Sequence, residues 1–287
     1  MARVVLMFLL MAGASLAQHF IPFLEKQTPE YKKFLKLYHI TNVLEQVIST
    51  DSTFITTPAP SSETLFTFDE NGNLLKAKFK AFNYVLSTVD SFVYNKTGKL
   101  EKIVSCTIDG HASEGANITT VLDFIYSKEN GQLSKVLHKE IEDGKSRDCG
   151  SYDYEYSKNS TLKQITDNSK IYFMGDLMPR CNYIYDDSGN LIKEDSDVRS
   201  ATHEYDSNGK IIKSVEIMEG LDPYTITYTY DKSGTLLKKK TESLTTFGDA
   251  EYMYAATGVL SSIQERWVYG YDIPTTYINL SISYNVE

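Results

Sequence analysis

The sequence predicts a mainly β protein: a large antiparallel meander of repeated hairpins, forming a curved open sheet or a closed barrel-like shell, with one N-terminal helix. One observation is a short phrase of an aromatic residue, a turn and a leucine that recurs along the chain. Another is the content of 21 Tyr and 13 Phe, because aromatic residues favour strands. The third is a hydrophobic fraction of 41% in 287 residues, enough for a sizeable buried core.

Residues 1–17 are expected to be a cleavable signal peptide. Arg3 precedes an apolar run over residues 4–11, which is too short to span a bilayer, and small residues end at Ala17. A buried first strand is the alternative. No later apolar segment is long enough for a transmembrane helix, so a secreted, periplasmic or cell-surface location is expected. The net charge of −9, without a basic stripe, argues against nucleic acid as a partner.

Residues 18–62 are expected to hold a helix and a linker. Thr28, Pro29 and Glu30 are typical of a helix start, and apolar residues recur at helical spacing as far as Ile48. The prolines at 58 and 60 indicate that residues 56–62 link this helix to a repeat domain over residues 63–287.

The repeat domain contains eight copies of the phrase, spaced 20 to 33 residues apart. Each copy has an aromatic residue four positions before a glycine, or five in one copy, and Leu or Ile two positions after it. In the fourth copy Ser160 replaces the glycine. The glycines are Gly72, Gly98, Gly131, Gly189, Gly209, Gly234 and Gly258.

This phrase predicts a β-hairpin. Asp favours the first position of a type I turn, and glycine supplies the positive φ that closes a three-residue loop. We number positions from the glycine, so that the aromatic residue is at −4 and the leucine at +2. Counting outward from the turn then pairs the aromatic residue with the leucine, and the residue at −6 with a lysine at +4, as in Phe66 with Lys76. Apolar residues at +5, such as Ile103 and Ile263, conflict with simple alternation. A bulge after the leucine would account for them.

Eight hairpins give about sixteen strands, and residues 281–286 look like half of a ninth copy that closes the meander. The lysine-rich strands argue against a lipid-facing barrel. The aromatic face needs a cover, because a large exposed apolar face is rare on a soluble protein. We expect the helix to dock on the concave face. The predicted contacts place Phe34, Leu35, Leu44 and Ile48 against Tyr185, Leu191, Tyr205 and Ile211.

Several phrases, including YIYDDSGNLIK and YTYDKSGTLLK, resemble the YD-repeat (Rhs-type) motif of bacterial surface and toxin-shell proteins. They are most similar to the irregular versions in small exported bacterial proteins. The resemblance covers approximately residues 66–263 and implies a curved or shell-like β-sheet on an exported protein. The chain has few, unevenly spaced copies and no appended toxin domain.

No catalytic residue, cofactor or metal site is predicted. The five histidines lack metal-ligand spacing, and the turn aspartates are explained by turn chemistry better than by calcium. The carboxylates of Asp153, Glu194 and Asp195 are interpreted as surface charges, because a glycosidase pair is defined by distance. Of the three cysteines, Cys149 and Cys181 are the favoured disulfide pair, although one intervening strand would separate them by about 9.6 Å.

Two functions remain open. The first is an exported, non-enzymatic binding or surface-interaction protein whose partner is a protein or a glycan at the cell surface. The second is a secreted hydrolase or carbohydrate-binding protein with a site that pattern reading does not find. Converging carboxylates or a histidine in a deep cleft would favour the enzyme.

Overall fold

The computed structural model describes residues 29–50, 60–82, 86–109, 117–170, 172–173, 176–177, 180–255, 260–269 and 275–286. The predicted signal peptide, most of the predicted linker and Gly258 lie outside these residues. Within them, no helix is long and apolar enough to cross a membrane.

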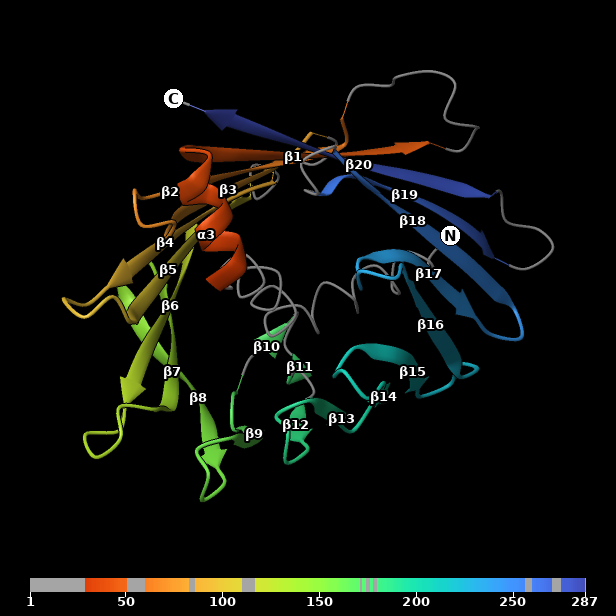
Figure 1. Ribbon diagram of the computed structural model, residues 1–287. Coiled ribbons are helices and arrows are strands. Elements are labelled where there is room, and N and C mark those ends of the chain that lie inside the picture. Colours follow the sequence, from red (N-terminus) through yellow and green to blue (C-terminus); the bar gives the residue numbers. More distant parts are fainter. Residues whose placement is uncertain are drawn as a thin grey trace.

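The described chain forms a closed antiparallel barrel of eighteen strands (Figure 1). Successive strands pair with each other, β9 pairs with β12, and β1 pairs with both β2 and β20, which closes the ring. The predicted meander is therefore confirmed in its closed form. The strands are β1 (Ile40–Thr50), β2 (Ser62–Phe68), β3 (Leu74–Ala81), β4 (Leu86–Tyr94), β5 (Leu100–Asp109), β6 (Asn117–Tyr126), β7 (Leu133–Glu142), β8 (Lys145–Tyr156), β9 (Leu162–Asp167), β12 (Asn182–Tyr185), β13 (Leu191–Asp195), β14 (Arg199–Tyr205), β15 (Ile211–Met218), β16 (Tyr224–Tyr230), β17 (Leu236–Glu242), β18 (Thr246–Tyr254), β19 (Leu260–Tyr269) and β20 (Thr276–Val286).

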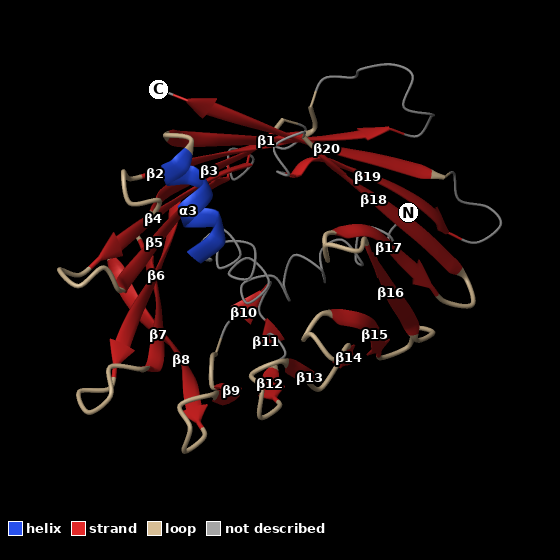
Figure 2. Cartoon of the chain, viewed as in Figure 1, coloured by secondary structure: helices blue, strands red, loops and turns tan. Residues whose placement is uncertain are grey.

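A separate two-stranded sheet, β10 (Tyr172–Phe173) with β11 (Asp176–Leu177), follows β9. One α-helix, α3 (Pro29–Leu37), precedes β1 and lies inside the ring of strands (Figure 2).

Each of the eight hairpins carries a bulge immediately after the leucine. In the first hairpin Phe68 pairs with Leu74 and Thr67 pairs with Lys76, so Leu75 has no partner of its own. The same shift occurs in the other seven hairpins. It moves the partner of the −6 residue from +4 to +5, so the predicted pair of Phe66 with Lys76 is wrong and Phe66 pairs with Ala77. An extra residue in one strand reverses the side-chain alternation beyond it, which places the apolar +5 residues inside and the +4 lysines outside.

The repeated aromatic residue joins neighbouring hairpins. The Tyr205 hydroxyl donates a 2.7 Å hydrogen bond to the backbone oxygen of Leu191, the leucine of the preceding hairpin. Five other tyrosines make the equivalent bond at 2.8–2.9 Å. The repeat thus encodes contacts between hairpins as well as the turn within each.

The glycines adopt the backbone that the turn requires. Gly189, Gly209 and Gly234 have φ of 88°, 76° and 87°, and Ser160 has φ of 66°. The aspartate three residues before the glycine closes the loop, as where Asp231 accepts hydrogen bonds from the backbone N–H groups of Ser233 and Thr235 at 2.8 Å.

The helix predicted over residues 28–50 is wrong in its second half. His39 adopts a left-handed conformation with φ of 52°, which ends α3, and residues 40–50 form β1 instead. This segment contains several β-branched residues, which favour strands. Pairing with β2 and β20 also removes the two exposed sheet edges that an open meander would have.

The prediction that the helix docks on the concave face is confirmed, with different contacts. Leu35 is 1% exposed, the Phe34 ring packs edge-on against Tyr284 at 5.7 Å, and the Tyr31 ring lies 6.0 Å from Phe68. The helix therefore contacts the wall next to β1. Tyr185 and Tyr205 are not among the described residues that pack against this core cluster, and Leu44 and Ile48 belong to β1 rather than to the helix.

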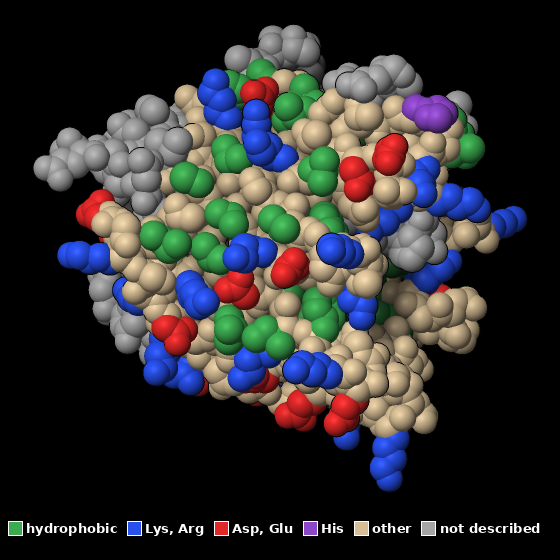
Figure 3. Space-filling model, turned by 90° about the vertical axis from the view of Figure 1, so that its left-hand side faces the viewer, with side chains coloured by type: hydrophobic (Ala, Val, Ile, Leu, Met, Phe, Trp, Pro, Cys, Tyr) green, Lys and Arg blue, Asp and Glu red, His purple; other side chains and the backbone are tan. Residues whose placement is uncertain are grey.

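The outer face mixes charged and apolar side chains (Figure 3). Lysines at +4 form cross-strand ion pairs, such as Lys135 with Asp153 at 2.9 Å and Lys102 with Asp123 at 3.4 Å. Seven hairpins each expose one apolar side chain near the turn, either at the bulge or immediately before the repeated aromatic residue. They are Leu75, Val93, Ile125, Ile192, Ile212, Leu237 and Met253.

Candidate functional site

The inner wall of the barrel carries an apolar region and a polar region, which we call the apolar half and the polar half. The apolar half surrounds α3, where Leu35, Val43, Phe66, Phe68 and Leu74 are part of one buried core cluster. The polar half is formed by β13, β14 and β15 and carries buried or half-buried ionisable side chains. Its members are Glu194, Arg199, His203, Ser214 and Glu216, which we call the polar cluster.

The hairpin geometry places these five residues on the inner face. The bulge at Ile192 turns Glu194 inward, opposite Tyr183, and the bulge at Ile212 does the same for Ser214, opposite His203. Arg199 lies at the far end of β14, two rungs from His203 on the same face. The interpretation of Glu194 as a surface charge is therefore wrong, because the bulge reverses its direction.

Every member of the polar cluster has a partner within it. Arg199 donates to Glu194 at 2.8 Å and lies 3.3 Å from Glu216. The two ring nitrogens of His203 lie 3.2 Å from the Glu194 Oε1 and 2.8 Å from the Ser214 Oγ. A buried charged group is tolerated when its hydrogen bonds are satisfied, so the network holds three neighbouring strands in one arrangement.

The electrostatics favour the charged forms of the ion pair. Burial alone would raise the pKa of Glu194, but the bond from His203 and the charge of Arg199 outweigh it and hold that pKa below its ordinary value. Burial would lower the pKa of Arg199, but Glu216 and Glu194 raise it. The pair is therefore ionised across the neutral pH range.

Ser214, His203 and Glu194 are connected in the order of a hydroxyl, an imidazole and a carboxylate, which is the order of a hydrolytic triad. Ser214 is only 1% exposed. A nucleophile must reach a substrate atom, and this hydroxyl has no open side from which one could approach. The arrangement therefore fits a structural network better than a catalytic one.

Tyrosine rings surround the polar cluster on the same wall. Tyr185, Tyr205, Tyr228 and Tyr230 are half-buried on the inner face of β12, β14 and β16. Burial raises the pKa of Tyr185 to about 12, so its hydroxyl keeps its proton and is able to donate a hydrogen bond. The polar half thus presents aromatic faces next to charged groups.

A second group of side chains meets where β7 and β8 pair. His138, Glu140 and Cys149 each place one potential ligand atom within 4.8 Å of the others. Burial lowers the pKa of His138, which favours the neutral imidazole. Sequence reasoning missed this group because His138 and Cys149 are eleven residues apart and meet only across a hairpin.

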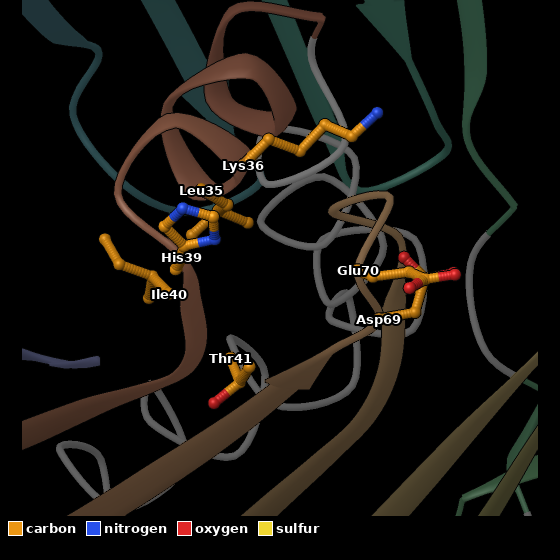
Figure 4. A pocket seen from close by; sticks show the side chains of 7 residues that line it. All are labelled: Leu35, Lys36, His39, Ile40, Thr41, Asp69 and Glu70. Atoms are coloured by element: carbon orange, nitrogen blue, oxygen red, sulfur yellow. The ribbon is translucent and has the colours of Figure 1, made fainter. Parts of the chain in front are cut away.

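A pocket of about 270 Å³ lies between the end of α3 and the first hairpin turn (Figure 4). Lys36 lines it from the last turn of α3, His39 and Thr41 line it from the chain after the helix, and Asp69 and Glu70 line it from the hairpin turn. Asp69 is engaged in closing that turn, with bonds of 2.7–2.9 Å to Asn71 and Asn73. The pocket is therefore partly a by-product of how the helix rests on the first hairpin.

The predicted disulfide is absent: Cys106, Cys149 and Cys181 are all free thiols. Cys149 lies on β8 and Cys181 precedes β12, with β9 between them. Two strand spacings exceed the reach of a disulfide, which is the reason the pair does not form.

No protein-family model matches the chain, and no curated protein is significantly similar to it in sequence. Among solved structures, it is similar to a porin-like protein from Bacteroides uniformis, with 11% identity, coverage of 86% of this chain and 97% of that chain, and a TM-score of 0.44. The TcdB2-TccC3 crystal structure matches 78% of this chain at 12% identity with a TM-score of 0.32. That match spans 15% of the TcdB2-TccC3 chain. The structure of the Photorhabdus luminescens Tc holotoxin pore matches 71% of this chain at 12% identity with a TM-score of 0.16, and that match likewise spans 15% of the holotoxin chain.

Proposed function

We propose that this protein is an exported, non-enzymatic binding protein that holds a glycan against the polar half of its inner wall. The observation that carries the proposal is the group of half-buried tyrosines beside the polar cluster. Export is inferred from the signal-peptide pattern over residues 1–17, and from the resemblance of the hairpins to YD-repeat proteins.

The width of the barrel supports a ligand inside. An eight-stranded barrel is filled by its own side chains, whereas barrels of sixteen to eighteen strands are wide enough to leave a lumen. Here α3 packs on the apolar half, near Phe68 and Tyr284. The contacts of the described helix therefore lie on the apolar half, and they do not cover the polar half of the wall.

The chemistry of the polar half suits a sugar. Sugars offer C–H faces that pack on aromatic rings and hydroxyl groups that bond to carboxylates and guanidinium groups. Tyr185 and Tyr228 supply rings, and Glu216 and Arg199 supply charged partners. Glu216 is the most exposed acidic member of the cluster, with 25% of its side chain accessible, and is the residue best placed to contact a ligand.

A glycan array probed with the purified protein tests the proposal. Glu216→Gln should weaken binding of any glycan that the wild type selects by about tenfold, the effect of a lost charged hydrogen bond. Glu204→Gln is the matched control, because Glu204 lies on β14 with an outward side chain that is 60% exposed. Equal effects of the two variants, or no glycan binding by the wild type, would refute the proposal.

A secreted hydrolase is the second candidate, favoured only by the Ser214, His203 and Glu194 series. Turnover of an ester and glycoside substrate panel by the wild type, abolished in Ser214→Ala, would establish it. We expect no turnover, because Ser214 is buried.

A further inference from the structure

His138 is a buried polar side chain without the partners that burial normally demands. It is 1% exposed, and within the described residues neither of its ring nitrogens has a hydrogen-bond partner. An unsatisfied buried polar group costs free energy and calls for an explanation, such as a bound ion. This contrasts with His203, both of whose nitrogens are satisfied.

The two nearest metal-binding side chains lie on the same inner face. Glu140 follows His138 by two residues on β7, so both point the same way, and Cys149 reaches the group from β8. Their ligand atoms all lie within 4.8 Å of one another. In a tetrahedral zinc site these atoms are about 3.5 Å apart, so side-chain rotation of roughly 1 Å would close the site around an ion.

A break in the strand pairing brings Cys149 to this position. Leu137 pairs with Ser151 and Lys139 pairs with Asp148, so Cys149 and Gly150 together face His138. Gly150 has φ of 89° and packs directly on the backbone oxygen of Asn168, where a Cβ would collide. The Lys170 N–H also donates to the Cys149 oxygen at 2.7 Å. Bulges of this kind re-aim side chains next to functional sites, and this one is held from outside the hairpin.

We propose that His138, Glu140 and Cys149 bind a divalent transition-metal ion, with zinc as the best match. An imidazole, a carboxylate and a thiolate form a donor set suited to zinc, whereas calcium and magnesium prefer oxygen donors alone. Three protein ligands leave a fourth position for water or an exogenous ligand.

The neighbouring charged groups fit this arrangement. Arg147 forms an ion pair with one oxygen of Glu140, which leaves the other oxygen for the metal. Asp167 is close but already committed, because its two oxygens accept the N–H groups of Ser169 and Cys181 at 2.8 and 3.1 Å. The proposed site therefore has three ligands and one second-layer partner.

Cobalt(II) added to the full-length reduced protein is the probe, because a cobalt–thiolate bond gives a charge-transfer absorption band and a tetrahedral site gives intense visible bands. The wild type should show both. The bands should disappear in Cys149→Ser, and His138→Asn should weaken cobalt and zinc binding by about tenfold or more. Cys106→Ser and Cys181→Ser are the matched controls and should retain the bands, since both thiols lie outside the group.

The far-ultraviolet circular dichroism of each variant establishes that it is folded. A second variant, Glu140→Gln, guards against misfolding of His138→Asn, and should also weaken binding by about tenfold or more. A wild-type protein without the thiolate band would overturn the proposal. So would a band that persists in Cys149→Ser or disappears in Cys181→Ser.

Discussion

The turn glycine and its aspartate determine each hairpin at the level of single residues. Gly234 has φ of 87°, and the Asp231 side chain accepts two backbone N–H groups within the same loop. Both features are local, and for this reason the turns could be predicted from sequence. The bulge at Leu237 could only be suspected from the sequence. The indication was that other copies of the repeat carry an apolar residue at +5, which simple alternation would place on the outer face.

Replacing Gly234 by Val should destabilise the protein by about 1 kcal/mol or more, because a β-branched residue is strained at positive φ. Chemical denaturation measures the loss. Lys232→Val, an exposed position in the same turn, should change the stability much less. Equal losses at the two positions would show that the backbone conformation is not the cause.

The buried ion pair predicts a specific pH dependence. Glu194 has a folded-state pKa below its ordinary value of 4.5. Its contribution is therefore complete above that value and is lost as the pH falls through the depressed folded pKa. Glu194→Gln should cost about 2 kcal/mol at neutral pH, because Arg199 keeps Glu216 as a partner.

Urea denaturation between pH 7 and pH 3 measures this dependence. The difference between the wild type and Glu194→Gln should shrink in acid, whereas Glu204→Gln should cost at most about 1 kcal/mol at any pH because its ion pair is exposed. A difference that stays constant with pH would contradict the assignment of the charged form to Glu194.

The N-terminal helix and β1 show where sequence reasoning ends at the level of elements. Residues 28–50 carry apolar side chains at helical spacing, but those from Ile40 onward serve a strand that pairs on both sides. The partner of that strand, β20, lies more than 200 residues later in the chain. No local pattern contains this information, so tertiary pairing overrides the local preference.

The packing of α3 gives a test at the same level. Leu35→Ala should lower the free energy of unfolding by about 2–5 kcal/mol, because Leu35 is fully buried in the core. Leu37→Ala is the matched control, since Leu37 is 67% exposed on the same helix and its loss should change stability by about 0.5 kcal/mol or less. Thermal or chemical unfolding of both variants distinguishes a docked helix from an appendage, for which the two would behave alike.

The polar cluster was not predictable from sequence, although its members were visible. Glu194 and His203 stand nine residues apart, and their meeting depends on the bulge at Ile192 and on the register of β13 with β14. His138 and Cys149 depend in the same way on the break between β7 and β8. One-residue register shifts decide which face a side chain occupies, and sequence patterns alone rarely locate them.

At the level of the whole molecule, eight hairpins and two single strands make one closed wall. Sixteen strands come from the repeated phrase, β20 is the predicted half-copy, and β1 fills the gap between β20 and β2. Closure gives every described strand of the barrel wall a neighbour on each side, so the wall itself presents no open sheet edge to another chain. It also creates an inside, on which both proposed sites depend.

Residue-resolved amide hydrogen exchange along β20 tests this closure most directly. In the closed barrel β20 pairs with β19 on one side and β1 on the other, so consecutive amides from Tyr277 to Ser281, the stretch paired on both sides, should all be protected. In an open sheet with β20 at the edge, every second amide would face solvent and exchange quickly. Uniform protection is the result we predict, and a period-two alternation of fast and slow exchange along β20 would contradict the closed barrel.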